Sequence, residues 1–490
     1  MREMKKGVIP AMNYKEIAEG LKALGLKKGS IVLLHSSFVS LGEVENGPQE
    51  VLKAFLSVIG KTGTLLVPVF GKLGILTEEL KKMPGAVVSS APVGTLAAVG
   101  ADAGELLANH WKAETAHGKD TPFTRIAEKG GYICLLGVDQ DRNTSLHSVE
   151  ALLELPYLGV AKSTFRNPAG KTVTKEYKYY PGPHRDFIGI DRLLLDSGAM
   201  QIKRIGNAQV RLIDSAMMFE TLLALGAEHS DLFLCNNPAC EDCVRQRSAI
   251  YKADQARESF RLTASAKLAG RYVPEIIENL RQEGISFVEL DCIQGKVCAS
   301  LPAEVLKKYV EEFAAASIKV SALRCPAVPD DPEGFACKMK EAGIKAVILP
   351  VDGADETAKA LKKAKIAMLT SNTSQTALRS ASLYEKCVKI HKDCRFAFNG
   401  ANFAAVGENP FLGSYRVGRF IRKIGQLDIV DALRTGEGTE FACGNGEIRE
   451  LVSILRCSNF SGFFSLGGGA AYPGTLAEAA EDFRDLLANI

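Results

Sequence analysis

The C-terminal part of the chain repeats one pattern, a short apolar run followed by an amphipathic helical segment. Eight strand-like runs, from RLTASAKL near Leu262 to FSGFFSLGG, alternate with helical patterns such as VPEIIENLRQEG. Strands separated by helices pair in parallel, because each helix returns the chain to the edge where the strands begin. Eight repeats in one domain are typical of a (β/α)8 barrel, so residues 262–490 are predicted to form one.

The first half of the chain also mixes strands and helices, but with less regular spacing. The apolar runs SIVLLH and GTLLVPVF flank a segment in which Pro48 is placed to begin a helix and Gly60 to end it. This order predicts a partly parallel α/β sheet within residues 1–258, and such sheets bind ligands at the carboxyl ends of their strands. Three polar residues follow the first strand at such an end: His35, Ser36 and Ser37.

Composition narrows the classes of function. The 490 residues carry a net charge of +3, and no Lys/Arg run is dense enough for a nucleic-acid or membrane surface. We therefore expect a cytoplasmic protein whose partners are small molecules, and a homo-oligomer is compatible with the sequence. The 12 cysteines are spread over the chain, which is typical of reduced thiols rather than of a disulfide scaffold.

Residues 135–150, LLGVDQDRNTSLHSVE, combine a buried strand, a polar loop and a helix start. Ser145 or Thr144 can cap that helix, which would carry His147 in its first turn. The positive end of the helix dipole disfavours the imidazolium form, so a neutral ring could accept a proton there. Glu150 lies three residues on, on the same helix face, where it could orient the ring or meet a substrate. A surface histidine at a helix start is the alternative.

A second group of potential ligands lies in HSDLFLCNNPACEDC, residues 229–243. Three thiolates and an imidazole complete a tetrahedral zinc shell, and Cys-x2-Cys is a common half-site. An iron–sulfur site is a weaker alternative because no fourth cysteine is near, and inert free thiols are another. The predicted structural zinc ligands are His229, Cys235, Cys240 and Cys243.

Three segments in the first half resemble the aminoglycoside 3-N-acetyltransferase (antibiotic N-acetyltransferase) family. They are residues 32–70, HGKDTPFTRIAEKGG at 117–131, and the Asn-Thr-x-x-His core with its following Glu at 143–150. The resemblance covers residues 10–228 and implies acetyl-coenzyme A as co-substrate. It implies that four residues bind the cofactor: His35, Ser36, Ser37 and Thr121. Thr121 occupies the position of the serine in the family's Ser-Pro pair.

The same resemblance implies residues that contact the substrate. Asn143 belongs to the core motif, and PHRDF supplies His184 and the acidic Asp186, for which a surface position and a helix cap are the alternatives. A β-hairpin is predicted before PHRDF, in residues 164–180. This chain departs from the family at residues 87–98, VVSSAPVGTLAA, where members carry an Arg and a His-Pro pair.

The C-terminal half resembles the xylose-isomerase-like barrels, most clearly in NGANFAAVGENPF and in residues 444–468. Those enzymes hold a divalent metal with Glu, Asp and His at successive strand ends. Here the corresponding ends read Thr370-Ser371-Asn372, Asn399 with Asn402, Gln426 to Asp428, and Ser465-Leu466-Gly467. Four carboxylates remain, Glu289, Asp291, Asp428 and Asp431, but no complete shell of carboxylates and imidazole for a hard metal can be assembled from these ends. The barrel is therefore predicted to lack metal catalysis, and it either binds a sugar or serves as a scaffold.

Together these observations predict an acetyl-coenzyme A-dependent N-acetyltransferase that acts on an amine of an amino sugar or an aminoglycoside-like molecule. His147 would take the proton, and Glu150 or Asp186 would orient the ring or neutralise the substrate ammonium. Two alternatives remain. One is a ligand-binding or sensor protein that uses both folds without catalysis, and the other is a bifunctional enzyme with a sugar isomerase or epimerase barrel.

Overall fold

The computed structural model describes residues 11–71, 73–179, 184–372, 382–383, 385–386, 395–417, 420, 423–469 and 472–490. The chain forms two compact units, Met1–Ile250 and Tyr251–Ile490. The boundary falls within helix α9 (Glu241–Ala256), close to the division expected between residues 258 and 262. Among the described residues, no helix is both long and apolar enough to cross a membrane.

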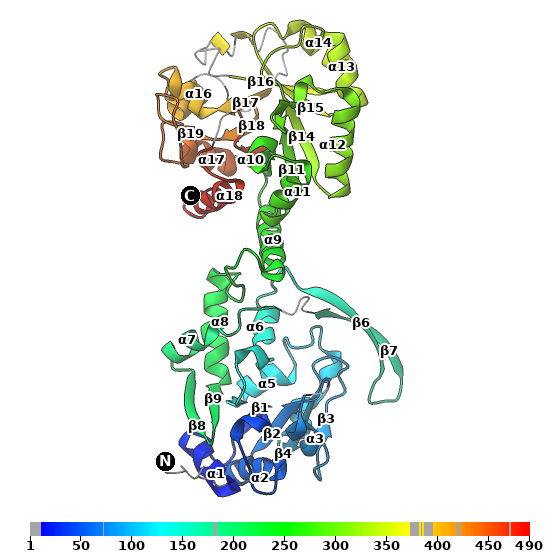
Figure 1. Cartoon of the computed structure of the whole chain (residues 1–490), viewed down its shortest axis with the longest axis vertical. Coiled ribbons are helices and arrows are strands. Elements are labelled where there is room, and N and C mark those ends of the chain that lie inside the picture. Colours follow the sequence, from blue (N-terminus) through cyan, green and yellow to red (C-terminus); the bar gives the residue numbers. More distant parts are fainter. Residues whose placement is uncertain are drawn as a thin grey trace, which may run out of the picture. The chain divides into compact units, whose positions relative to one another are not determined.

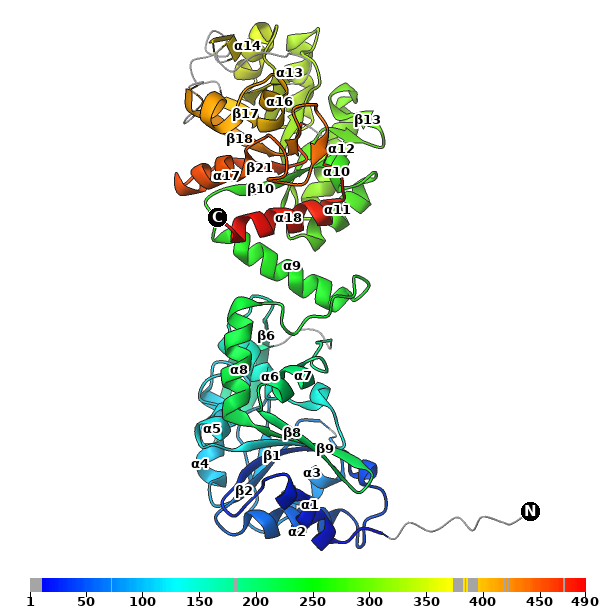
Figure 2. The same ribbon diagram turned by 90° about the vertical axis from the view of Figure 1, so that its left-hand side faces the viewer.

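The first unit is built on a seven-stranded mixed sheet with the order β3-β4-β2-β1-β5-β9-β8 (Figures 1 and 2). β1 lies at its centre and pairs in parallel with β2 and β5, whereas the outer strands are antiparallel. The strands are β1 (Ile31–Ser36), β2 (Thr64–Pro68), β3 (Val87–Val88), β4 (Leu96–Gly100), β5 (Tyr132–Leu136), β8 (Met200–Ile205) and β9 (Ala208–Asp214). The partly parallel sheet predicted from the sequence is confirmed.

Alternate residues of β1 face different cores, because successive side chains of a strand point to opposite faces. Val32 and Leu34 pack in the cluster formed with α1 (Tyr14–Ala23) and α2 (Pro48–Ile59), which lie in blue beside each other in Figures 1 and 2. Leu33 packs on the other face with Phe123 of α5 (Pro122–Glu128). α2 begins at Pro48, as the sequence predicted, and α5 likewise begins at a proline, Pro122.

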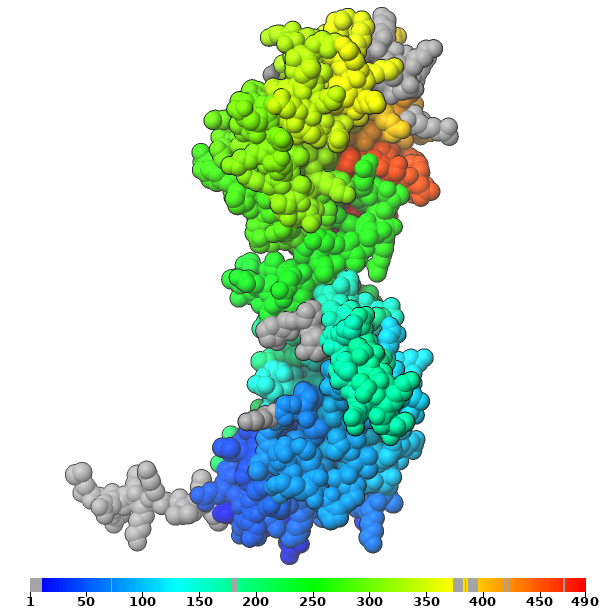
Figure 3. All heavy atoms as spheres, turned by 90° about the vertical axis from the view of Figure 1, so that its right-hand side faces the viewer, coloured from blue at the N-terminus to red at the C-terminus, as the bar shows by residue number. Residues whose placement is uncertain are grey.

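A long β-hairpin follows the helix that carries His147. It consists of β6 (Gly159–Arg166) and β7 (Thr172–Tyr179), paired antiparallel along their whole length. Asn167 makes the turn, with its side-chain oxygen accepting the N–H groups of Ala169 and Lys171. The hairpin is the predicted one, and it stands on the outer surface of the unit (teal in Figures 1 and 3).

The second unit is a closed barrel of eight parallel strands, which confirms the predicted fold class. The strands are β10 (Arg261–Ser265), β11 (Phe287–Leu290), β14 (Lys319–Arg324), β15 (Ala346–Pro350), β16 (Ala367–Ser371), β17 (Arg395–Asn399), β18 (Ile424–Ile429) and β21 (Phe463–Leu466). Helices pack outside them (Figure 1), among them α12 (Ala303–Ala315), α13 (Pro332–Glu341), α14 (Asp355–Lys363), α17 (Ile448–Cys457) and α18 (Leu476–Ala488).

Candidate active site

A cavity of about 660 Å³ opens in the first unit where its three parallel strands end. Its lining includes the ends of β1 and β2, the residue that follows the turn after β5, and two later segments of the chain. Representative members are Ser36, Pro68, Val138, His147 and Arg185. Parallel α/β sheets bind their ligands at this edge, so the cavity is the candidate active site.

The turn after β5 directs the chain to this cavity. Gly137 has a φ of +64°, and a Cβ atom there would lie 1.6 Å from Ser40 Oγ, so only glycine fits. The helix that follows, α6 (Leu146–Leu152), receives no side-chain cap from Ser145. Ser145 does occupy the N-cap position, as expected, and the Asn143 side-chain oxygen accepts the Ser145 N–H at 3.2 Å just before the helix begins.

The central pair of the site is His147 and Glu150 on α6. His147 Nδ1 lies 2.7 Å from Glu150 Oε2, and because a carboxylate can only accept, Nδ1 is the donor. Glu150 is fully buried, and its other oxygen accepts hydrogen bonds from Tyr157 at 2.8 Å and from Arg185 Nε at 2.6 Å. The arrangement fixes the tautomer of His147 and assigns Nε2 as the nitrogen that would accept a proton from a ligand.

These contacts hold Glu150 in its charged form. Burial on its own would raise the pKa of the Glu150 carboxyl, but the His147 hydrogen bond and the Arg185 guanidinium outweigh it, and the pKa is lowered. For Tyr157, burial and then the neighbouring Glu150 charge raise the pKa of the phenol. The pair therefore presents an ionised carboxylate behind the histidine, which stabilises positive charge on the ring.

Two further histidines, His117 and His35, line the same cavity. The His117 ring centroid is 5.6 Å from that of His147, and Phe187 packs on His147 at 5.1 Å. Burial, and then the His147 charge, hold the pKa of His117 well below its usual value, and burial lowers the pKa of His35 to about 4. Both rings are therefore neutral at physiological pH. His117 heads the HGKDTP motif but was not predicted as a site residue.

The residues predicted to bind the cofactor are only partly at the cavity. His35 and Ser36 line it. The Ser37 N–H instead donates to Leu136 O at 2.9 Å, as an extension of strand pairing. Thr121 is fully buried and its hydroxyl donates to Gly118 O at 2.7 Å, so it supports the start of α5 rather than the cavity wall.

The predicted substrate residues are also divided. Asn143 is in the lining, although its side chain already bonds Gln140 and Ser145. The Asp186 carboxylate accepts the Gly189 N–H at 3.3 Å. This bond corresponds to the alternative in which Asp186 caps a helix rather than contacts a substrate. The residue between His184 and Asp186 in PHRDF, Arg185, is the one that lines the cavity and bonds Glu150. The sequence signal that could have identified Arg185 is its position inside PHRDF, a motif that was already noted.

The two arginines of the described cavity lining are each paired with a carboxylate, Arg142 with Asp141 and Arg185 with Glu150. Among its described lining residues, Asp141 is the only carboxylate, and it pairs with Arg142 at 3.3 Å. Arg185 is the second guanidinium in the lining. The segment that departs from the family contributes Pro92, Val93 and Gly94, which have no charge to offer.

The three loop cysteines meet a different imidazole from the one predicted. Possible ligand atoms of His184, Cys235, Cys240 and Cys243 all lie within 4.8 Å of one another. His229 instead ends α8 (Ser215–Glu228), where its N–H bonds Leu225 O, and its side chain is exposed. The segment before α7 (Ile190–Asp196) returns beside the cysteine loop, where the Asp186 N–H bonds Phe233 O at 2.8 Å, and this return brings His184 to the cysteines.

In the second unit, the carboxyl ends of the barrel strands hold an internal ion network. Arg324 lies between two fully buried carboxylates, with Nε 2.5 Å from Glu289 Oε1 and Nη2 2.7 Å from Asp428 Oδ1. Gln426 and Ser465 also donate to Glu289, at 2.6 and 3.0 Å. The guanidinium occupies the space between the carboxylates where a cation would bind.

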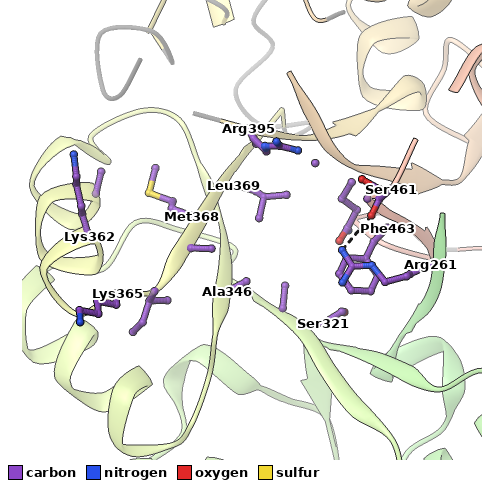
Figure 4. Close-up of a pocket in the computed structure, with 17 residues that line it drawn as sticks. Arg261, Ser321, Ala346, Lys362, Lys365, Met368, Leu369, Arg395, Ser461 and Phe463 are labelled. Atoms are coloured by element: carbon purple, nitrogen blue, oxygen red, sulfur yellow. Dashed lines mark hydrogen bonds between the residues drawn. The ribbon is translucent and has the colours of Figure 1, made fainter. Parts of the chain in front are cut away.

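A cavity of about 720 Å³ in the second unit lies at the opposite, amino-terminal ends of the strands. In Figure 4 the Arg261 guanidinium lies against the Phe463 ring, 3.9 Å from its centre, and donates to the Ser461 carbonyl. Other basic side chains in the lining are Lys362, Lys365 and Arg395, and no described lining residue is acidic. Barrel enzymes use the other face, and this cavity holds no acid–base pair, so the first unit remains the candidate for catalysis although its cavity is smaller.

The sheet and the His147–Glu150 pair thus define an α/β domain equipped for general-base chemistry. The sequence model for "Aminoglycoside 3-N-acetyltransferase" matches residues 33–72 and 71–225. The aminoglycoside N(3)-acetyltransferase IV of Salmonella sp is 29% identical over 224 residues, 42% of this chain and 85% of that protein. The aminoglycoside N(3)-acetyltransferase IX of Micromonospora chalcea is 29% identical over 252 residues, which are 41% of this chain and 89% of that protein. The N-terminal half of this chain belongs to the aminoglycoside 3-N-acetyltransferase family.

Several solved structures are also similar to this chain. The crystal structure of aminoglycoside acetyltransferase AAC(3)-Xa is 30% identical and is matched over 45% of this chain and 94% of its own, with a TM-score of 0.41. AAC(3)-IVa, solved as the apoenzyme, is 27% identical over 50% of this chain and all of its own, with a TM-score of 0.45. AAC-IIIb, solved as a binary complex with CoASH, is 24% identical and is matched over 45% of this chain and 97% of its own, with a TM-score of 0.41.

Proposed function

We propose that the first unit transfers an acetyl group from acetyl-coenzyme A to a primary amine of an amino sugar. The observation that carries the proposal is the His147–Glu150 hydrogen bond of 2.7 Å at the cavity wall, in a domain that belongs to an acetyltransferase family. The named activity of the curated relatives supports the reaction class.

In this reaction the amine nitrogen attacks the thioester carbon while His147 Nε2 accepts a proton from the nitrogen. The C–S bond then breaks, and coenzyme A leaves as its thiol or thiolate. Glu150 stabilises the imidazolium that forms, and Arg185 with Tyr157 holds Glu150 in place. No covalent intermediate on the protein is needed. General-base help of this kind is worth about 10²–10⁴-fold in rate.

Coenzyme A is proposed to bind along the carboxyl end of β1. His35 and Ser36 line the cavity there, and the relative AAC-IIIb was solved with CoASH. The Ser36 hydroxyl can donate to or accept from the amide-rich pantetheine arm. The Ser37 N–H and the Thr121 hydroxyl are not part of this proposed contact, because both donate to backbone carbonyls.

The charge of the cavity favours an acceptor with a single amine. A substrate with several ammonium groups needs several carboxylates, whereas the described lining offers only Asp141, which is already paired with Arg142. An ion pair at about 4 Å is worth on the order of 1 kcal/mol even in water, and each further ammonium group would lack it. An amino sugar with one amine and several hydroxyls therefore fits better than a polycationic aminoglycoside.

We expect acetyl transfer from acetyl-coenzyme A to glucosamine. For gentamicin we expect kcat/KM to be lower by about tenfold or by more than that, because the extra ammonium groups of gentamicin find no carboxylate partners in the cavity. Thiol release measured with both acceptors tests this directly. A higher kcat/KM for gentamicin would contradict the charge argument. Absence of transfer to any amine, together with no acyl-coenzyme A binding in calorimetry at millimolar ligand, would contradict the proposed function itself.

For the second unit we propose a role without metal-dependent isomerisation. The carboxylates expected to remain as potential ligands are already bonded: Arg324 holds Glu289 and Asp428, and Asp291 accepts from Ser265 at 2.5 Å. We expect no aldose–ketose conversion by the full chain with Mg²⁺, Mn²⁺, Co²⁺ or Zn²⁺. Chelator-sensitive turnover of any common sugar would show that the ion network is displaced by a metal.

A further inference from the structure

The loop between α8 and α9 meets the segment before α7 at four potential metal ligands. His184 Nδ1 lies 3.2 Å from Cys243 Sγ and 3.3 Å from Cys240 Sγ, and Cys235 completes the group within 4.8 Å. Zn–S and Zn–N bonds of about 2.3 and 2.0 Å place the ligands of a tetrahedral zinc about 3.5–3.8 Å apart. The four atoms therefore surround a space that a small movement adapts to one ion.

The donor set selects zinc among common cations. Three soft sulfurs and one imidazole suit Zn²⁺, whereas Mg²⁺ and Ca²⁺ require oxygen ligands. All three cysteines are free thiols rather than disulfides. Cys240 and Cys243 form a Cys-x2-Cys half-site across the start of α9, where the helix dipole favours thiolates. The Cys235 N–H also donates to Cys243 Sγ at 3.4 Å, the kind of bond that supports a metal-bound sulfur.

This group is connected to the candidate active site through the backbone of His184. Arg185 Nη1 donates to the His184 carbonyl at 2.9 Å, and Gln246 of α9 donates to the same oxygen at 3.4 Å. From this position Arg185 Nε reaches Glu150 at 2.6 Å. The next residues are attached to the same loop, because the Asp186 N–H bonds Phe233 O at 2.8 Å.

We propose that His184, Cys235, Cys240 and Cys243 bind one structural zinc ion, and that the ion holds Arg185 where it fixes Glu150. The zinc site stands independently of the acetyl-transfer activity, whereas the positioning role rests on that proposed function. Binding converts the three thiols to thiolates and releases their protons to solvent. The ion has no place for substrate, because four protein ligands fill its shell.

The metal site is tested by elemental analysis of the full chain purified without added metal. We expect close to one zinc per chain, and loss of most of it in Cys240→Ser and in His184→Ala. His229→Ala and Cys337→Ser are the matched controls, because both side chains are exposed and outside the group, and both should keep the zinc. Zinc-free wild-type protein that also fails to take up added Zn²⁺, or loss of zinc in His229→Ala alone, would overturn the assignment.

Affinity measured by competition with a chromophoric chelator keeps the test valid if a variant folds poorly. Removing the His184 ligand is expected to weaken zinc binding by on the order of 100-fold or more, since even second-layer changes cost 10–100-fold. Cys240→His replaces the cysteine ligand with another zinc ligand, so it should bind zinc where Cys240→Ser does not. Equal affinity in wild type and His184→Ala would show that the imidazole is not a ligand.

The positioning role is tested by removing zinc from the wild-type protein with a chelator. We expect kcat for acetyl transfer to fall at least tenfold while KM for acetyl-coenzyme A changes little, and added Zn²⁺ should restore kcat. Unchanged kcat in zinc-depleted protein would overturn the positioning role and leave the metal site standing. Zinc content is measured without any assay of activity, so failure of the proposed function and failure of the metal site are distinguishable.

Discussion

Replacing His147 with alanine is expected to lower kcat for acetyl transfer by about two to four orders of magnitude, because the amine then loses the group that takes its proton. Nδ1 is engaged by the buried Glu150, so the Nε2 side of the ring is the part that acts on substrate. The effect should appear mainly in kcat, since a proton acceptor acts in the transition state.

Binding of coenzyme A should be nearly unchanged in the His147→Ala variant, as its proposed contacts are at His35 and Ser36. Calorimetry with coenzyme A separates this result from general damage to the fold. His229→Ala is the matched control, because this histidine is exposed at the end of α8 and should retain full activity. A His147→Ala protein with wild-type kcat would rule out the general-base role.

The second large effect is expected for Glu150→Gln. The Arg185 side chain is only 3% exposed, and an amide at position 150 removes the carboxylate charge that pairs with it in the interior. Breaking one partner of a buried pair typically costs about 3–5 kcal/mol in the free energy of unfolding. The chain has a single tryptophan, Trp111, which lies in the first unit, so its fluorescence during urea denaturation reports on that unit.

Asp196→Asn is the matched control for this experiment. Asp196 pairs with Arg192 on the same unit, but the two side chains are 62% and 82% exposed, so its loss should cost about 0–1 kcal/mol. A Glu150→Gln protein as stable as this control would show that Arg185 finds another partner or water. It would also weaken the role assigned to Arg185 in holding the catalytic pair.

The pH dependence of the Glu150→Gln effect follows from the direction of the pKa shift. The pKa of Glu150 is lower in the folded than in the unfolded chain, so the unfolded state binds the proton more readily. The stabilisation is therefore fully present above the unfolded glutamate pKa of about 4.3 and is lost as pH falls through the folded value. The stability difference between wild type and variant should be constant near neutral pH and shrink in acid.

The order of elements was readable from the sequence because it depends on local physical chemistry. Apolar runs marked the strands, Pro48 marked a helix start, and the pattern of residues 164–180 marked the hairpin. The alternation in residues 262–490 was enough for the barrel, since strand–helix repeats allow few arrangements. His147 and Glu150 could be paired for the same reason, as residues three apart share one helix face.

Contacts between distant segments were decided only by the tertiary structure. Arg185 reaches Glu150 across 35 positions, and no local pattern encodes that approach. His184 rather than His229 joins the cysteines because spatial return of the chain, not proximity in sequence, brings ligands together. Arg324 between Glu289 and Asp428 was likewise invisible in the sequence, because three barrel strands converge on one point only when the barrel closes.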